Sequence, residues 1–250
     1  MVKPRSEKEL ELMRESGRIT SLVLKKVLEE IKVGVTGLEL DKIAEEEIKR
    51  LGGEPSFKTV PGYHYAICIT FNEEVVHGVP SERKIKEGDV VSIDTGAVFK
   101  GWHTDSAWTV LVGQDQGKEK FLQVGQEALK LGIEQAVAGN KIGDISCAIQ
   151  NKVEGGGYGV VRSLVGHGVG RDLHEEPEIP GYGRPGRGLK LKPGMTLAIE
   201  VIYTQGNFEV VVDGDGWTIS TADQSLSGLF EISIIVGKSE AEILTYPIVG

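Results

Sequence analysis

Four acidic residues interrupt apolar, strand-like stretches of this sequence and are its first candidates for chemistry. An ionised carboxylate taken out of water costs several kcal/mol unless a partner compensates it. Small neighbours such as Ser92 and Gly96 share a strand face with the first acid, because side chains alternate along a strand. They leave room for a partner. The acids are Asp94 in VVSIDTG, Asp105 in WHTDSAW, Glu200 in TLAIEVIY and Glu231 in GLFEISII.

The first two acids are expected on one hairpin that turns at residues 99–101. In that register Asp94 and Asp105 fall nearly opposite, with Cβ atoms about 5 Å apart. Two bare carboxylates so placed would repel, and a cation between them removes the conflict. His167, in GHGVGRDLHEEP, adds a nitrogen donor. Four carboxylates and a histidine suit one or two divalent metals, and two ions about 4 Å apart can support hydrolysis.

Elements that would position these residues follow from capping and periodicity. Ser6 and Glu9 have capping-box spacing at the start of a helix that extends to about residue 31, and Thr36 with Glu39 begins a second helix that ends before GGEP. Strands are expected at 65–71, 90–98 and 103–112. Two further helices, at 118–137 and 142–154, precede a second series of strands. DGDGW at 213–217 is expected to be a hairpin turn.

The second half of the chain repeats the order of the first. KEGDVVSID and KPGMTLAIE align at an offset of 106, which sets Asp94 against Glu200. This repeat predicts one domain over 1–250, with pseudo-twofold halves of about 1–115 and 116–250 whose equivalent strands meet in the middle. The supporting matches at an offset of 105 are Gly34, Leu40, Ile43 and Gly52 with Gly139, Ile145, Ala148 and Gly157.

Composition narrows the class of protein. The net charge is −9 without a basic block, which argues against nucleic acid or an anionic membrane as the main partner. No apolar run approaches the roughly 18 residues of a membrane span. Cys68 and Cys147 suggest no disulfide framework and favour a reducing compartment. We expect a soluble, cytoplasmic protein.

Motifs over nearly the whole chain resemble the type I methionine aminopeptidases of peptidase family M24. The resemblance implies the pita-bread fold, an α+β architecture of duplicated halves with a curved antiparallel sheet and helices on its outer face. The short spacing from His167 to Glu200 leaves no room for the helical insertion of type II enzymes. The matching segments are NEEVVHGVP, GDVVSIDTGAVFKGWHTDSAWT, VGHGVGRDLHEEPEIPGYG, LKPGMTLAIEV, DGWT and SGLFEIS.

The resemblance also implies a role for each matched residue. His77 and His174 would position the substrate and stabilise the tetrahedral intermediate, and Glu200 would shuttle protons for a metal-activated water. Tyr63, Cys68 and Trp217 would form an apolar pocket for a methionine side chain. The two divalent ions would be cobalt, manganese, iron or zinc, with Asp105 and Glu231 bridging. The implied metal ligands are Asp94, Asp105, His167, Glu200 and Glu231.

Such enzymes remove N-terminal methionine from peptides and nascent proteins whose second residue is small. Association with the ribosome would suit that task, although no residue argues for it, and nothing demands more than a monomer. Three residues depart from the family pattern. Val201 replaces a proline, and Leu229 and Ile232 lie in GLFEIS where A-Q-F/Y-E-H-T is usual. Alternation turns Val201 and Ile232 away from the acids, whereas Leu229 shares the face of Glu231. Leu229 is therefore the departure placed to lower activity, alter metal preference or shift specificity, and the sequence does not decide among these.

Three other functions remain open at this point. The same fold serves peptidases of different N-terminal specificity, such as Xaa-Pro peptidases. A peptide-binding homologue with weakened catalysis would keep the fold, although such proteins usually lose ligands and this one has lost none. A structural β-rich domain with an incidental cation site leaves the glycine-flanked His77 and His167 unexplained.

Overall fold

Two helices precede the main strands in each half of the chain. The computed structural model describes residues 3–246. Within them the first helix begins at the expected capping box, where the Glu9 carboxylate accepts the Ser6 N–H at 2.7 Å. Asp115 caps the third helix by accepting from Gly117 N and Lys118 N. The helices are α1 (Glu7–Glu29), α2 (Gly37–Arg50), α3 (Gln116–Glu134) and α4 (Ile142–Gly155), with a 3-10 turn, η1 (Phe57–Thr59).

The strands form one large antiparallel sheet and one small one. Among residues 3–246 the large sheet has ten strands in the order β1-β4-β5-β12-β9-β7-β8, with β2 on β4, β6 on β9 and β13 on β12. The small sheet is β10-β11-β3. The strands are β1 (Glu54–Pro55), β2 (Ile67–Phe71), β3 (Glu74–Val76), β4 (Val90–Phe99), β5 (Trp102–Leu111), β6 (Gly159–Val160), β7 (Val165–Gly168), β8 (Glu175–Pro180), β9 (Thr196–Thr204), β10 (Val210–Val212), β11 (Ile219–Thr221), β12 (Ser227–Ile235) and β13 (Glu242–Ile243).

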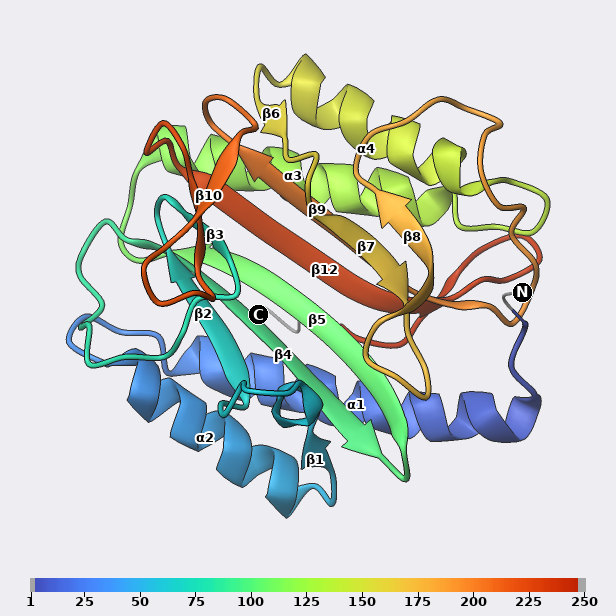
Figure 1. The fold of residues 1–250 in the computed structure, drawn as a ribbon, viewed down its shortest axis with the longest axis horizontal. Coiled ribbons are helices and arrows are strands. Elements are labelled where there is room, and N and C mark those ends of the chain that lie inside the picture. Colours follow the sequence, from blue (N-terminus) through green and yellow to red (C-terminus); the bar gives the residue numbers. More distant parts are fainter. Residues whose placement is uncertain (1–2, 247–250) are drawn as a thin grey trace.

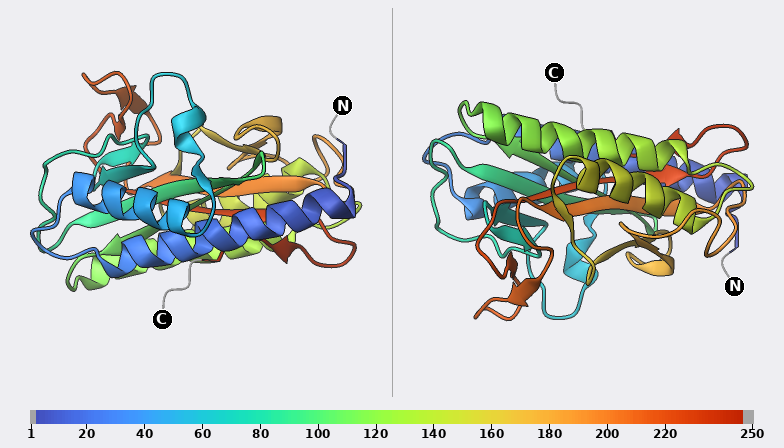
Figure 2. Two further views of the ribbon diagram at one scale, coloured as in Figure 1. Left: turned by 90° about the horizontal axis from the view of Figure 1, so that it is seen from below. Right: turned by 90° about the horizontal axis from the view of Figure 1, so that it is seen from above.

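All four helices cover the same face of the large sheet. Figures 1 and 2 show α1 and α2 beneath the strands of the first half and α3 and α4 beneath those of the second, while the β10–β11 hairpin and η1 project from the other face. Two apolar clusters fill the space between layers. One joins α1 and α2 to β2 and β4, and the other joins α3 and α4 to β9 and β12. The face of the large sheet opposite the helices is therefore the one on which a functional site can form.

The internal duplication is visible in backbone geometry. Helix α2 spans 37–50 and α4 spans 142–155, so both ends repeat at the offset of 105 that the sequence gives. Gly34 and Gly139 precede these helices with φ of 95° and 100°, a left-handed conformation that glycine adopts without strain. Strands β5 and β12, one from each half, lie side by side in the middle of the sheet. The predicted α+β architecture of two pseudo-symmetric halves is confirmed.

Observed element bounds lie within about three residues of those predicted from periodicity. DGDGW forms the expected turn between β10 and β11. Within residues 3–246, none of the helices combines the length and apolarity that crossing a bilayer requires.

Candidate metal centre

The four acids lie on the face of the sheet that the helices leave uncovered. Three of them are in register across neighbouring strands, and the fourth is one step further along β5. Glu231 of β12 is directly opposite Glu200 of β9 and Ala107 of β5, and Ala107 is directly opposite Asp94 of β4. Asp105 of β5 lies two residues from Ala107, so it shares this face one step along the strand. His167 of β7 pairs with Ala198, which lies two residues from Glu200. Strands from both halves thus contribute to one cluster.

One detail of the expected hairpin is wrong. Asp94 pairs with Ala107, and Asp105 pairs with Gly96, so the two aspartates are diagonal neighbours rather than opposite one another. The cause is the turn, which consists of Lys100 and Gly101 alone, with φ of 50° and 76°. Positive φ at both central residues is typical of a tight type I′ turn, and lysine gives no sequence signal for it. The aspartates still share a face.

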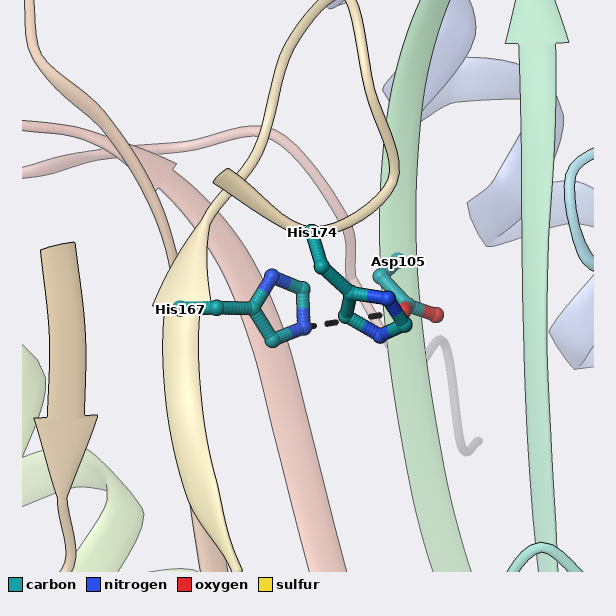
Figure 3. Close-up of side chains that lie close together, drawn as sticks. All are labelled: Asp105, His167 and His174. Carbon is teal, nitrogen blue, oxygen red and sulfur yellow. Dashed lines mark ion pairs between the residues drawn. The ribbon is translucent and has the colours of Figure 1, made fainter. Parts of the chain in front are cut away.

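His167 presents one ring nitrogen to the acids. Its Nδ1–H donates a hydrogen bond to the Gly168 carbonyl at 2.9 Å. The proton is then on Nδ1, and the lone pair of Nε2 is free to coordinate a metal ion. Nε2 lies 3.6 Å from Glu231 Oε1 and 4.0 Å from Asp105 Oδ2. Figure 3 shows the His167 and His174 rings beside Asp105, with ring centroids 4.5 Å apart. Two histidines and an acid therefore meet at one edge of the cluster.

The donor set fits a divalent cation. Asp94 Oδ1 and Glu231 Oε1 are buried and have no hydrogen-bond partner among residues 3–246. Buried carboxylate oxygens without a partner are costly, and a metal ion supplies the missing charge. Three overlapping groups have ligand atoms within 4.8 Å of one another: Asp94–Asp105–Glu231, His167–Glu200–Glu231 and Asp105–His167–His174. Carboxylate oxygens with imidazole nitrogen suit divalent ions of the first transition row.

Electrostatics show how strongly the cluster disfavours four negative charges. Burial raises the pKa of Asp105 to about 7, and burial with the nearby Asp105 charge raises the pKa of Glu200 to about 8. The pKa values of Asp94 and Glu231 lie well above the usual range, first through burial and then through neighbouring carboxylates. Burial lowers the pKa of His167 to about 4. The raised pKa values of the four carboxyl groups show that the cluster resists negative charge unless a cation is present to balance it.

We expect the metal-free protein to lose stability as the pH rises above 6.5. Asp105 and Glu200 have folded-state pKa values of about 7 and about 8, above their ordinary 3.8 and 4.5, so their contribution is complete below the ordinary values and is lost through the raised ones. His167 acts in the opposite direction, because its pKa is lowered, but only below its ordinary value of 6.5. The net loss by about pH 8.5 should be about 2 kcal/mol.

Urea unfolding in the presence of a chelator would measure this loss. Glu200→Gln should reduce the slope of stability against pH, and added manganese should remove the loss. Stability that stayed constant or rose over the same range would contradict the assignment of raised carboxyl pKa values.

A mainly apolar pocket includes Asp94 and Asp105 in its lining. Its volume is ≈ 130 Å³, comparable to the ~150 Å³ cavities that accept benzene. Tyr63, Cys68 and Trp217, the residues expected around a methionine side chain, all line it, with the Tyr63 and Trp217 rings 5.2 Å apart. The pocket is also lined by residues that the sequence did not single out: Phe57, Val60 and Leu173. Leu173 precedes His174 in a segment already marked as functional, whereas Phe57 and Val60 carry no periodic signal.

A second hollow is lined by all four acids and by His167, and it shares Asp94 and Asp105 with the apolar pocket. Both His77 and His174 line the apolar pocket and this hollow, so the two histidines stand between them. His77 has φ of 58°, a conformation that non-glycine residues rarely adopt and that is commoner at functional sites. The aliphatic lining of the hollow is Val76, Leu164, Val165, Ile202 and Leu229.

The histidine loop between β7 and β8 is fixed by an ionic contact. The Glu175 carboxylate accepts from Arg171 N at 2.6 Å and Asp172 N at 3.2 Å, and it pairs with Arg5. The neighbouring acids Asp172 and Glu176 are exposed, so Glu175 is the one of the three whose carboxylate holds the loop. His103 is also buried, with Nδ1 2.7 Å from Ser56 Oγ.

The three departures from the family pattern fall where alternation predicted. Val201 and Ile232 are buried in the apolar cluster on the helix side of the sheet. Leu229 is 2% exposed on the opposite side, where it packs with Val76 and Ile202 at the second hollow. Only Leu229 is placed to influence a substrate.

Known proteins share this fold and sequence. The methionine aminopeptidases of Bacillus subtilis and Clostridium perfringens are 45% and 44% identical over 246 residues, covering 98% of this chain and 99% of theirs. The crystal structure of a methionine aminopeptidase from Thermotoga maritima superimposes with a TM-score of 0.96 at 43% identity, covering 98% of this chain and 99% of that one. A prolidase from Pyrococcus furiosus, 24% identical with a TM-score of 0.78, shares the fold over 97% of this chain and 65% of its own.

The family model for Metallopeptidase family M24 matches residues 11–228. That range includes Asp94, Asp105, His167 and Glu200, and Glu231 follows it by three residues. With the match of fold and of nearly the whole sequence, the chain belongs to metallopeptidase family M24.

Proposed function

We propose that this chain is a methionine aminopeptidase that hydrolyses the first peptide bond of peptides and nascent proteins with a small second residue. The observation that carries the proposal is the composition of the apolar pocket, in which Tyr63, Cys68 and Trp217 lie together with Asp94 and Asp105. A side chain filling this pocket would place the first peptide bond of the substrate at the acids. A thioether suits such a pocket, because sulfur contacts with aromatic edges are favourable.

As a member of this family the chain takes a divalent metal cofactor. Two adjacent ions, of cobalt, manganese, iron or zinc, are supported by the overlap of the candidate groups, since Asp105 and Glu231 each belong to two of them. Asp94, Asp105, His167, Glu200 and Glu231 would hold the ions. When bound, they would supply Lewis-acid stabilisation of charge on the peptide carbonyl.

The protein side chains would handle protons and orientation. With the ions bound, the Glu200 carboxylate would accept a proton from the attacking water and deliver it to the departing amine. His77 and His174, between the two hollows, would donate to the oxyanion as it forms. The second residue of the substrate would enter the hollow beside Leu229 and Ile202, whose side chains restrict it to small groups.

Release of methionine from Met-Ala-Ser tests the proposed function. Metal-free protein would be reloaded with manganese or cobalt and compared on Met-Ala-Ser, Met-Leu-Ser and Ala-Pro. We expect metal-dependent release from the first, weak release from the second and none from the third. Cleavage of Ala-Pro alone would assign the chain to the Xaa-Pro peptidases, and bound metal without any cleavage would favour a peptide-binding homologue.

Substitution of Trp217 should separate substrate binding from chemistry. Trp217→Ala removes one wall of the pocket and its edge contact with Tyr63, an interaction equally present before and during reaction. KM for Met-Ala-Ser should rise about tenfold with kcat changed less than about threefold. Val211→Ala, an exposed position on the same hairpin, is the matched control and should change neither. A loss confined to kcat would place Trp217 outside the methionine pocket.

The proposed function also implies a cytoplasmic enzyme, because nascent chains are made in the cytoplasm. Both cysteines, Cys68 and Cys147, are free thiols, as expected in the reducing cytoplasm. The large sheet draws strands from both halves, which supports a single catalytic domain over residues 1–250. We infer that it works as a monomer on peptide and nascent-protein N-termini, a task that association with the ribosome would suit.

A further inference from the structure

The two halves of the protein meet along an incomplete strand pair. Strands β5 and β12 span ten and nine residues, yet only Ala107 with Glu231 and Ser106 with Ile232 are paired directly. By contrast, β12 pairs with β9 along all nine residues, from Ser227 to Ile235. The seam between the halves therefore needs other contacts on each side of these two pairs.

Side-chain hydroxyl groups supply those contacts. On one side, the Asp105 N–H donates to Ser233 Oγ at 2.9 Å, and the Ser233 hydroxyl donates back to the Asp105 carbonyl at 2.8 Å. Ser233 N–H donates in turn to Thr245 Oγ1 at 2.9 Å, and the Thr245 hydroxyl lies 3.3 Å from the Asp105 carbonyl. Ser233 and Thr245 are fully buried. The main chain of Asp105 is thus held to β12 through a serine side chain instead of a backbone ladder.

Glu231 is held differently. It pairs directly with Ala107 across the seam, and its carbonyl accepts the Ser106 hydroxyl at 2.9 Å. The same residue pairs with Glu200 on its other side. Asp105 and Glu231 each belong to two candidate ligand groups. The main chain of Glu231 is paired with strands on both sides, whereas that of Asp105 is joined to β12 by side-chain hydroxyl groups. Asp105 pairs with Gly96 on its β4 side, but across the seam its N–H has the Ser233 hydroxyl as its partner, and its carbonyl is contacted by the hydroxyl groups of Ser233 and Thr245.

We propose that Ser233 is a positioning residue for Asp105, and that its hydroxyl sets how tightly the centre binds its second divalent ion. Removing the hydroxyl leaves the Asp105 N–H without its partner in the buried seam and lets β5 shift against β12. The Asp105 carboxylate then leaves the position from which it reaches both groups of ligand atoms. The inference rests on the proposed metal centre, and its test is kept separate from peptide hydrolysis.

Thr109 offers a matched control at the same seam. The Leu229 N–H donates to Thr109 Oγ1 at 3.0 Å, and the Thr109 hydroxyl donates to the Leu229 carbonyl at 2.6 Å. This is the arrangement found between Ser233 and Asp105, but it acts on a residue that carries no ligand atom. Thr109 is 1% exposed and Ser233 is fully buried, so both substitutions remove a hydroxyl from the same dry environment.

The experiment is calorimetric titration of metal-free protein with manganese, comparing Ser233→Ala, Thr109→Val and the conservative Ser233→Thr. Urea unfolding of each metal-free variant would accompany it. Ser233→Ala should weaken the second binding step at least about tenfold, the loss typical when a group that orients a ligand is removed. Thr109→Val should stay within about twofold at a comparable loss of stability, and Ser233→Thr should restore most of the affinity. The absorption spectrum of the cobalt form should change for Ser233→Ala alone.

Equal weakening by Ser233→Ala and Thr109→Val, or no weakening by either, would overturn the inference. Its failure can be told apart from failure of the proposed function. If wild-type protein releases methionine while both variants bind manganese alike, only the positioning role is lost. If no variant cleaves any peptide but the order of affinities holds, the positioning role stands and the proposed activity falls.

Discussion

Asp105→Asn is expected to reduce methionine release from Met-Ala-Ser by at least about a thousandfold. Asp105 belongs to two of the candidate ligand groups, with Asp94 and Glu231 in one and with His167 and His174 in the other. Asparagine keeps the shape and one acceptor oxygen but carries no negative charge, so the ligand position proposed to be shared between two cations would be lost. Elemental analysis should show less than the wild-type metal content after dialysis.

Stability distinguishes this loss from misfolding. In metal-free protein the Asp105 carboxyl group is buried beside other acids, and its pKa is raised to about 7. Removing a charge that the fold disfavours should leave the metal-free variant at least as stable as the wild type above that pH. Asp172→Asn, an exposed carboxylate on the histidine loop, should retain activity within about twofold. Wild-type activity in Asp105→Asn would remove Asp105 from the metal ligands.

Much of the architecture could be predicted because several local signals agree. The capping boxes at Ser6 and Thr36 set two helix starts, and the periodic apolar positions set their faces. The repeat offset of 105 applies to helix ends as well as to residues, since α4 follows α2 at that offset at both ends. Acids on otherwise apolar strands identified the site, because a buried charge demands a partner wherever it occurs.

What the sequence did not predict depends on contacts between distant segments. The hairpin register depends on Lys100 at positive φ, a conformation that lysine adopts rarely and for which it gives no sequence signal. Ser233 is one small polar residue among many, and only the opening between β5 and β12 gives its hydroxyl a role. Phe57 joins the pocket through η1, a turn too short to have a period. In each case the structure depends on how two segments contact one another, which the residue pattern of neither segment reveals.

His174→Ala should lower kcat for Met-Ala-Ser by about a hundredfold to a thousandfold, the usual loss of one oxyanion donor. His174 lines both hollows, where the first peptide bond would lie, and its loop is held by Glu175 and Arg5. Partial burial lowers the pKa of His174, so the ring is neutral at neutral pH and keeps one N–H to donate. KM should change less than about threefold, since the interaction strengthens only as charge develops.

Metal binding decides between two roles for this histidine, because His174 also has a ring nitrogen within reach of Asp105 and His167. As a donor to the substrate, it can be replaced without loss of either manganese-binding step, and His174→Gln, which keeps an amide N–H, should retain about ten times more activity than alanine. As a ligand, its loss should remove one binding step in both variants alike. His64→Ala, an exposed histidine outside both hollows, should change neither kcat nor manganese affinity. We expect the first pattern, because His174 is exposed at the mouth of the site whereas His167 is buried among the acids.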